Sequence, residues 1–183
     1  MTLVYIITVG NKDKEILQKL LPKNLTQDIQ FIAGESSYGA RSLASSLLAT
    51  RNTPVALVLD ADTDNESQIW ERHDLINYAL NQASPGIPYQ IFFAVPEIEI
   101  VFLQDKSLIE KIAQRKFNDL EWQLAKINPK EFLEIVFGKG EQINAKIFDN
   151  ITNTEIKILQ QHPLIESIIA FVASLIPSSV VIN

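Results

Sequence analysis

Three aspartates, Asp60, Asp62 and Asp64, follow directly on an apolar run in the sequence. The run, at residues 55–59, is aliphatic and predicts a buried β-strand. Side chains at alternate positions of an extended chain leave it on the same side, so the three carboxylates are expected to converge just past the strand. Mg²⁺, or Mn²⁺ in its place, would offset their repulsion, because hard divalent cations take carboxylate, water and phosphate oxygens as ligands. The alternative is that the aspartates only cap the helix that follows.

A second acidic pair, Glu97 and Glu99, follows an apolar run at residues 89–95. If the chain stays extended there, both carboxylates leave it on the same side. Glu97 is then expected to add a metal ligand to the aspartates, and Glu99 is expected to take part in acid–base catalysis. The alternative is that the pair marks a helix N-terminus, where acidic side chains interact favourably with the helix dipole.

The elements that must position these acids alternate between strand and helix. Apolar, β-rich runs predict four strands, and apolar residues at helical spacing predict a helix after each of the first three. Such strands pair in parallel through right-handed crossovers, which predicts an open α/β sheet with helices on both faces. The predicted strands span residues 3–9, 28–33, 55–59 and 89–95, and the predicted helices span residues 11–21, 40–50 and 66–82.

The first and third strands are expected to be adjacent and central in this sheet. Ligands of open α/β sheets bind outside the carboxyl ends of the strands. This rule brings Gly10, Asp60 and Glu97 to one rim, with the loop at residues 34–39 beside them.

Only helical spacing is found from residue 104 onward, at residues 105–117, 129–137, 154–161 and 163–175. Asp105 and Thr154 are the expected N-caps. We therefore predict an α/β core over residues 1–103 and a mainly helical extension over residues 104–183, packed together as one compact domain. Residues 178–183 are expected to form a short added strand or a loose tail.

The composition excludes several classes of protein. The 183 residues suffice for one sizeable core, and the absence of cysteine excludes disulfides and thiolate metal sites. With no signal-peptide pattern before the first strand, a cytoplasmic location is expected. The apolar stretch at residues 164–176 is shorter than the roughly 20 residues that a membrane span needs, so no membrane partner is expected. A net charge of −6 argues against a broad basic face, so a nucleic-acid partner would be held at a local, metal-assisted site or together with a partner protein.

Together, these segments resemble the Toprim domain of topoisomerases, bacterial primases and nucleases of the overcoming-lysogenisation-defect type. The resemblance rests on Val9-Gly10 at the end of the first strand, on the loop and helix around Gly39, on the DxD motif at residues 60–62, and on the acidic step at residues 96–99. It covers residues 2–103 and looks most like small stand-alone Toprim-like proteins of prokaryotes. The resemblance implies a Toprim/Rossmann-like sheet that binds Mg²⁺ and carries out nuclease-like phosphodiester chemistry on nucleic acid.

The chain departs from the Toprim pattern at the end of its first strand. Members of the family carry a glutamate there, whereas this chain has Thr8 and Val9, which cannot bind a metal or act as a base. Catalysis is therefore expected to be weak or absent. Glu35, after the second strand, is the candidate substitute for the missing acid. The alternative is a non-catalytic, Toprim-derived binding or adaptor module that kept the fold.

A glycine-containing loop at residues 34–42 offers a candidate phosphate site. It has the glycine spacing of a P-loop, but Ala40 stands where the phosphate-binding lysine is required. Backbone amides at the helix start near Gly39, together with Arg41, are still expected to hold a single phosphate.

Two further interpretations of the aspartates stay open. Residues 60–71 match the D-x-D-x-D calcium loop with Glu71 at position twelve, but Asn65 stands where that loop needs glycine, and a strand precedes it where a helix is required. Aspartate-based phosphoryl transfer, as in receiver-like domains, needs a lysine or a hydroxyl group at a later strand end. This chain has Ala94 and Val95 at the end of its fourth predicted strand.

Overall fold

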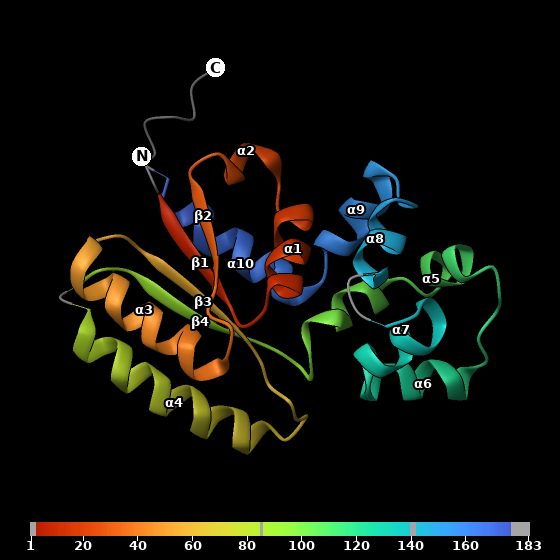
Figure 1. The fold of residues 1–183 in the computed structure, drawn as a ribbon, viewed down its shortest axis with the longest axis horizontal. Coiled ribbons are helices and arrows are strands. Elements are labelled where there is room, and N and C mark those ends of the chain that lie inside the picture. Colours follow the sequence, from red (N-terminus) through yellow and green to blue (C-terminus); the bar gives the residue numbers. More distant parts are fainter. Residues whose placement is uncertain (1–2, 85, 140–141, 177–183) are drawn as a thin grey trace.

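Four parallel strands form the centre of the computed structural model, which describes residues 3–84, 86–139 and 142–176. Their order across the sheet is β2-β1-β3-β4, so the first and third strands are adjacent and central, as predicted (Figure 1). The strands are β1 (Val4–Thr8), β2 (Ile29–Ala33), β3 (Val55–Asp60) and β4 (Tyr89–Ala94). The predicted open α/β fold is confirmed.

Helices cover both faces of the sheet. Helices α3 (Ser37–Arg51) and α4 (Glu66–Ala83) pack on one face, in a hydrophobic cluster that includes Ile7 and Leu57 of the strands. Helices α1 (Asn11–Leu20) and α10 (Pro163–Ser174) pack on the other, in a cluster that includes Ile6. Neighbouring residues of β1 thus point to opposite faces, which is why the central strands are nearly continuous apolar runs instead of alternating.

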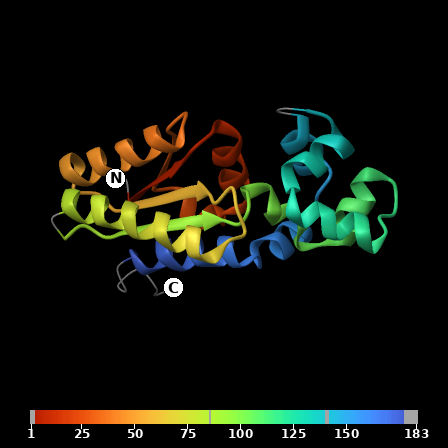
Figure 2. The same cartoon turned by 90° about the horizontal axis from the view of Figure 1, so that it is seen from below.

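The remaining helices lie mostly beyond the carboxyl ends of the strands, which point toward them (Figure 2). Their buried side chains belong to the same hydrophobic cluster as the face of the sheet that α1 covers. This cluster contains Phe102, Leu133 and Leu159 as well as Val4. No helix within the described ranges has the length and apolar character needed to cross a membrane. These elements are α2 (Lys23–Thr26), the 3₁₀ helix η1 (Ile98–Gln104), α5 (Lys106–Ala113), α6 (Asp119–Ile127), α7 (Pro129–Phe137), α8 (Gln142–Phe148) and α9 (Asn153–Gln160).

Several helix ends differ from the predictions, among them the start of α3, which begins at Ser37 and not at residue 40. Asp105 caps α5 as predicted, accepting a hydrogen bond from the Ser107 amide at 2.9 Å. The predicted N-cap Thr154 is wrong: Thr152 caps α9, because its hydroxyl accepts from the Glu155 amide while the Glu155 carboxylate accepts from the Thr152 amide. The helix predicted over residues 105–117 ends at Ala113, because the next residue is left-handed at φ 54°. The prediction for residues 178–183 lies outside the described part of the chain.

Two glycines at the start of α3 are explained by close backbone contact. A Cβ atom on Gly39 would lie 2.1 Å from the Gly34 carbonyl oxygen, and one on Gly34 would lie 2.3 Å from the Ala40 nitrogen. Ser36 closes the same turn, since its hydroxyl accepts a hydrogen bond from the Gly39 amide at 2.9 Å. Packing of the loop against the helix therefore requires this glycine spacing, with or without a phosphate.

Gly39→Ala is therefore expected to destabilise the protein by about 3 kcal/mol, since backbone atoms must move apart to admit the new methyl group. Gly10→Ala is the matched control: its added Cβ would lie 3.4 Å from the Asp13 carboxylate, an ordinary contact. Urea unfolding of both variants measures the difference. Equal stability of Gly39→Ala and Gly10→Ala would contradict the packing explanation.

Candidate acidic site at the carboxyl end of the sheet

Asp60 is the last residue of β3 and is fixed by the segment that follows β4. The Ile98 amide donates a hydrogen bond to Asp60 Oδ1 at 2.9 Å. The backbone continues this pairing past the strands, because the Ala61 amide donates to the Ala94 carbonyl at 2.8 Å and the Asp62 amide to the Pro96 carbonyl at 2.9 Å. The carboxylate is thereby held at the rim of the sheet, against the start of η1.

Asp13 is a member of the site that the sequence analysis missed. It lies in the first turn of α1, and its Oδ2 accepts a hydrogen bond from the Gly10 amide at 2.8 Å. This bond folds the carboxylate back toward the end of β1, which neighbours β3. Asp13 therefore supplies an acid close to where the chain has Thr8 and Val9. Its sequence signal is the acidic residue three positions after Gly10 at a helix start, a common capping spacing.

Glu99 is buried, with 7% of its surface exposed, which is unusual for a glutamate. The chain does not stay extended after β4, because η1 begins at Ile98. The condition under which Glu97 and Glu99 would leave the chain on the same side is therefore not met, and the pair instead marks a helix N-terminus, with Glu97 at the N-cap and Glu99 in the first turn. Glu97 instead faces the helical region, where its Oε2 accepts a hydrogen bond from the Lys130 amide at 3.2 Å.

The carboxylates of Asp13, Asp60 and Glu99 act on one another electrostatically. Burial and, after it, the negative charges of Asp13 and Glu99 raise the pKa of Asp60 to about 7, against the opposing hydrogen bond from Ile98. Burial also raises the pKa of Glu99 and that of Asp13, and the positive charge of Lys130 partly opposes both shifts. The three segments that carry these acids, α1, β3 and η1, are far apart in the sequence. We call these three residues the acidic cluster.

The DxD turn does not have the geometry that the sequence predicts. Asp62 is left-handed at φ 56°, which ends the extended run, so the three aspartates do not leave the chain on one side. Asp62 and Asp64 instead line a pocket next to the acidic cluster. The helix-capping alternative is also not what the structure shows, because Asn65 caps α4 by accepting from the Gln68 amide at 3.2 Å.

Arg72 of α4 holds this turn from the other side, and the sequence analysis did not identify it. Its guanidinium donates to the carbonyl oxygens of Ala61 and Asp60, the latter at 3.3 Å. It also lies over the Phe93 ring, 5.2 Å from the ring centre. The carbonyl groups that follow the last ladder bond of β3 are thus satisfied by a charged donor, which fixes the backbone beside Asp60.

The other predicted site residues lie away from the acidic cluster. Glu35 is exposed at the end of β2, which β1 separates from β3, so two strand spacings of about 10 Å lie between them. Gly39 is part of the packed turn described above. Arg41 lines a separate pocket between α3 and α4, of about 320 Å³, and its Nε donates to the Ser37 carbonyl at 3.2 Å.

The donor set of the acidic cluster consists only of oxygen atoms, which suits Mg²⁺ or Mn²⁺ and not Zn²⁺. Among the described residues, no three His, Cys, Asp or Glu side chains are grouped so that they could hold a metal ion. A cation here would therefore be bound directly by two carboxylates at most, with water or a phosphate completing its shell, as is usual for Mg²⁺.

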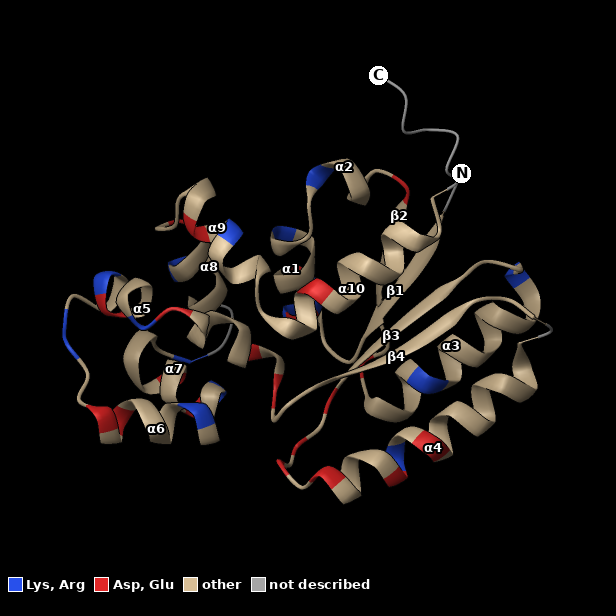
Figure 3. Ribbon diagram, turned by 180° about the vertical axis from the view of Figure 1, so that it is seen from behind, with Lys and Arg blue, Asp and Glu red and all other residues tan. Residues whose placement is uncertain are grey.

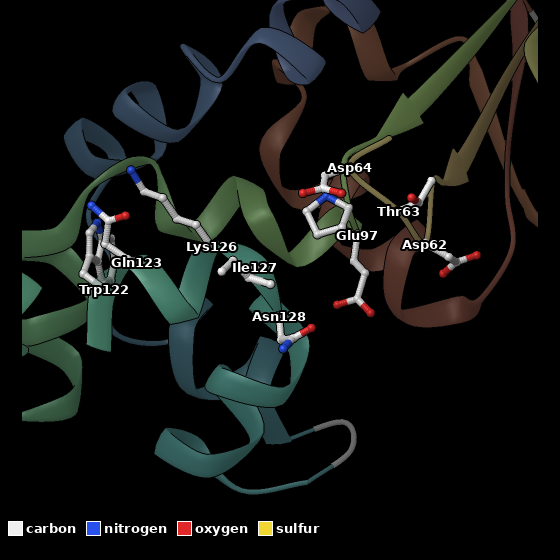
Figure 4. A pocket seen from close by; sticks show the side chains of 10 residues that line it. Asp62, Thr63, Asp64, Glu97, Trp122, Gln123, Lys126, Ile127 and Asn128 are labelled. Atoms are coloured by element: carbon white, nitrogen blue, oxygen red, sulfur yellow. The ribbon is translucent and has the colours of Figure 1, made fainter. Parts of the chain in front are cut away.

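A pocket of about 630 Å³ separates the sheet rim from α6 (Figure 4). Asp62, Asp64 and Glu97 line its sheet side, and Trp122 and Lys126 of α6 line its far side. Figure 3 shows the acidic positions gathered where the chain leaves β3 and β4. Asp62 and Glu97 also raise the pKa values of Asp60 and Glu99 respectively, so the pocket wall lies within electrostatic reach of the acidic cluster.

Comparisons with known proteins add no relative. The chain matches no protein-family model, no curated protein and no solved structure. The fold itself is an open four-stranded parallel sheet of order 2-1-3-4, flanked by helices.

Proposed function

We propose that this is a Toprim-like protein that binds Mg²⁺ or Mn²⁺ at the acidic cluster and acts on phosphate esters of nucleic-acid type. The observation that supports it is the meeting of Asp13, Asp60 and Glu99 at the carboxyl end of the sheet, where ligands of open α/β folds bind. Asp13 takes the part of the family's strand-one glutamate in this proposal. The resemblance through the DxD motif at residues 60–62 points in the same direction.

The residues of the cluster divide the expected chemistry between them. Asp60, fixed by the Ile98 amide, is the proposed direct ligand, and Asp13 or Glu99 is the second. The bound cation would supply positive charge for a phosphate oxygen. Burial raises the pKa of Glu99, which favours its protonated form relative to an exposed glutamate, so Glu99 is the proposed proton donor to a leaving group.

A non-catalytic binding module is the second candidate. Two of the acids already accept backbone hydrogen bonds, Asp13 from Gly10 and Asp60 from Ile98, and these bonds hold structure together without any ligand. The absence of a preformed three-ligand group among the described residues favours the same candidate. Such a module would bind the cation and the phosphate but would not turn over.

Cleavage of single-stranded DNA and RNA in the presence of Mn²⁺ tests the proposal. We expect slow hydrolysis by the wild type, a rate at least about 100-fold lower for Asp60→Asn, because the cation is lost, and a lower rate for Asp13→Asn, because an acid of the cluster is lost. Asp149→Asn, on the exposed surface of the helical region, is the control and should keep the wild-type rate. Mn²⁺ binding without any cleavage would select the non-catalytic module, and hydrolysis that is equal in all four proteins would contradict the site.

A further inference from the structure

The pocket between the sheet rim and α6 has two chemically different ends. Figure 4 shows Asp62, Asp64 and Glu97 at one end, and Trp122, Gln123 and Lys126 at the other. The first end is acidic and lies next to the acidic cluster. The second offers an aromatic ring, an amide and an ammonium group.

The α6 end is presented as one surface by helical spacing. Trp122 and Lys126 are four residues apart, as are Gln123 and Ile127, so each pair lies on the same side of the helix. The Trp122 ring is fixed from behind, because it packs edge-on against Phe132 with the ring centres 6.1 Å apart. A fixed, half-buried indole is a stacking surface for a flat ring, at little entropic cost.

The volume and the charges select a small ligand. About 630 Å³ is within the range of small-molecule sites and exceeds what a cation with one phosphate would fill. A phosphate cannot approach Asp62 and Glu97 without a cation between them, whereas Lys126, beside Trp122, can donate a hydrogen bond to an acceptor at the other end of the ligand. A polynucleotide needs a row of cations along its path. Within the described ranges, Figure 3 shows lysines and arginines scattered instead of aligned on one face, and the chain carries a net charge of −6.

We propose that this pocket binds a free nucleoside phosphate together with Mg²⁺, with the phosphate toward Asp62 and Glu97 and the base against Trp122. The side chains of Gln123 and Asn128 are then available to hydrogen-bond the edge of the base. This inference rests on the proposed function, because the cation bound at the sheet rim must also lie between the phosphate and Asp62 and Glu97, which line the pocket within electrostatic reach of the acidic cluster. It sharpens that function from phosphate esters of nucleic-acid type to mononucleotides.

Equilibrium dialysis of adenosine monophosphate against the full chain, with and without Mg²⁺, tests the inference. We expect binding that requires Mg²⁺ and that weakens by roughly 5- to 100-fold in Trp122→Leu, as the loss of one stacking contact implies. Lys126→Gln should weaken binding by about 5-fold or more, and this substitution lies on an exposed position that the fold does not need. The matched controls are Trp70→Leu, on the exposed face of α4, and Lys157→Gln, on the exposed face of α9. Both should bind like the wild type.

Other outcomes separate this inference from the proposed function. Stabilisation by Mg²⁺ without any binding of adenosine monophosphate would overturn the pocket alone. The absence of any Mg²⁺ effect would overturn the proposed function and the pocket with it. A short oligoadenylate that binds more than about 10-fold tighter than the mononucleotide would show that the ligand is a polymer. Spermidine that binds without Mg²⁺, and that Mg²⁺ displaces, would show a site for organic cations and would also overturn the inference.

Discussion

Without divalent cations, Asp60→Asn will make the protein more stable at pH 8 by about 2 kcal/mol and will have little effect near pH 4. The pKa of Asp60 is raised from the ordinary 3.8 to about 7 in the folded protein, first by burial and then by Asp13 and Glu99. Between these two values, the folded state binds a proton that the unfolded state has released. Stability therefore falls as the pH rises from about 4 to 7 and stays low above that.

The size of this effect follows from the shift. Each unit of pKa difference corresponds to about 1.4 kcal/mol, and roughly half of the full amount is expected because Asp60 is only partly buried and solvent screens its charge. Asparagine removes the charge and keeps an oxygen that accepts the hydrogen bond of the Ile98 amide. Urea unfolding in EDTA at pH 4 and pH 8 measures it, with Asp149→Asn as the control. A loss of stability in Asp60→Asn at pH 8 would show that the carboxylates do not repel one another as described.

Saturating Mg²⁺ is expected to make the wild type more stable than Asp60→Asn at pH 8, which reverses their order of stability without the cation. A ligand at 100 times its dissociation constant stabilises the native state by about 2.7 kcal/mol, which for a chain of this size is roughly 5–10 °C in melting temperature. The wild type should gain this amount at pH 8, whereas Asp60→Asn should gain almost nothing and Asp13→Asn should gain less than the wild type. Asp149→Asn should respond like the wild type.

Thermal unfolding with and without excess Mg²⁺ gives this comparison directly. Ca²⁺ serves as a second cation, because it needs more ligands than two carboxylates supply and should stabilise less. An equal gain in the wild type and in Asp60→Asn would place the bound cations on the exposed surface and not at the acidic cluster.

The architecture was predictable because its signals are local. Aliphatic runs alternate with segments of helical spacing, and this alternation predicts a parallel sheet with helices on both faces. The capping of α5 by Asp105 is local in the same way. Helix α6 escaped prediction because its apolar residues point outward: Leu120 and Leu124 are mostly exposed, and Ala125 is the buried residue. Apolar periodicity alone does not predict a short helix whose large apolar side chains are exposed.

The site was only partly predictable, since its geometry is tertiary. Asp60 follows from the strand that precedes it. The position of Glu99 depends on η1, whose first turn carries it inward, and that of Asp62 depends on a left-handed backbone that the alternation rule does not anticipate. The capping spacing holds Asp13 at the end of β1, but nothing in that spacing indicates that β3 and η1 bring Asp60 and Glu99 to the same place. The acid expected at Glu35 was sought on the wrong side of β1 for the same reason.

The central claim is that a divalent cation binds at Asp60 together with Asp13 or Glu99, and crystals soaked in Mn²⁺ test it most directly. We expect an anomalous difference peak about 2.2 Å from a carboxylate oxygen of Asp60 and of one of its two partners. Asp60→Asn crystals, soaked in the same way, should lack the peak. Anomalous density that appears only on exposed carboxylates, with none at Asp60, would contradict the site and the function proposed for it.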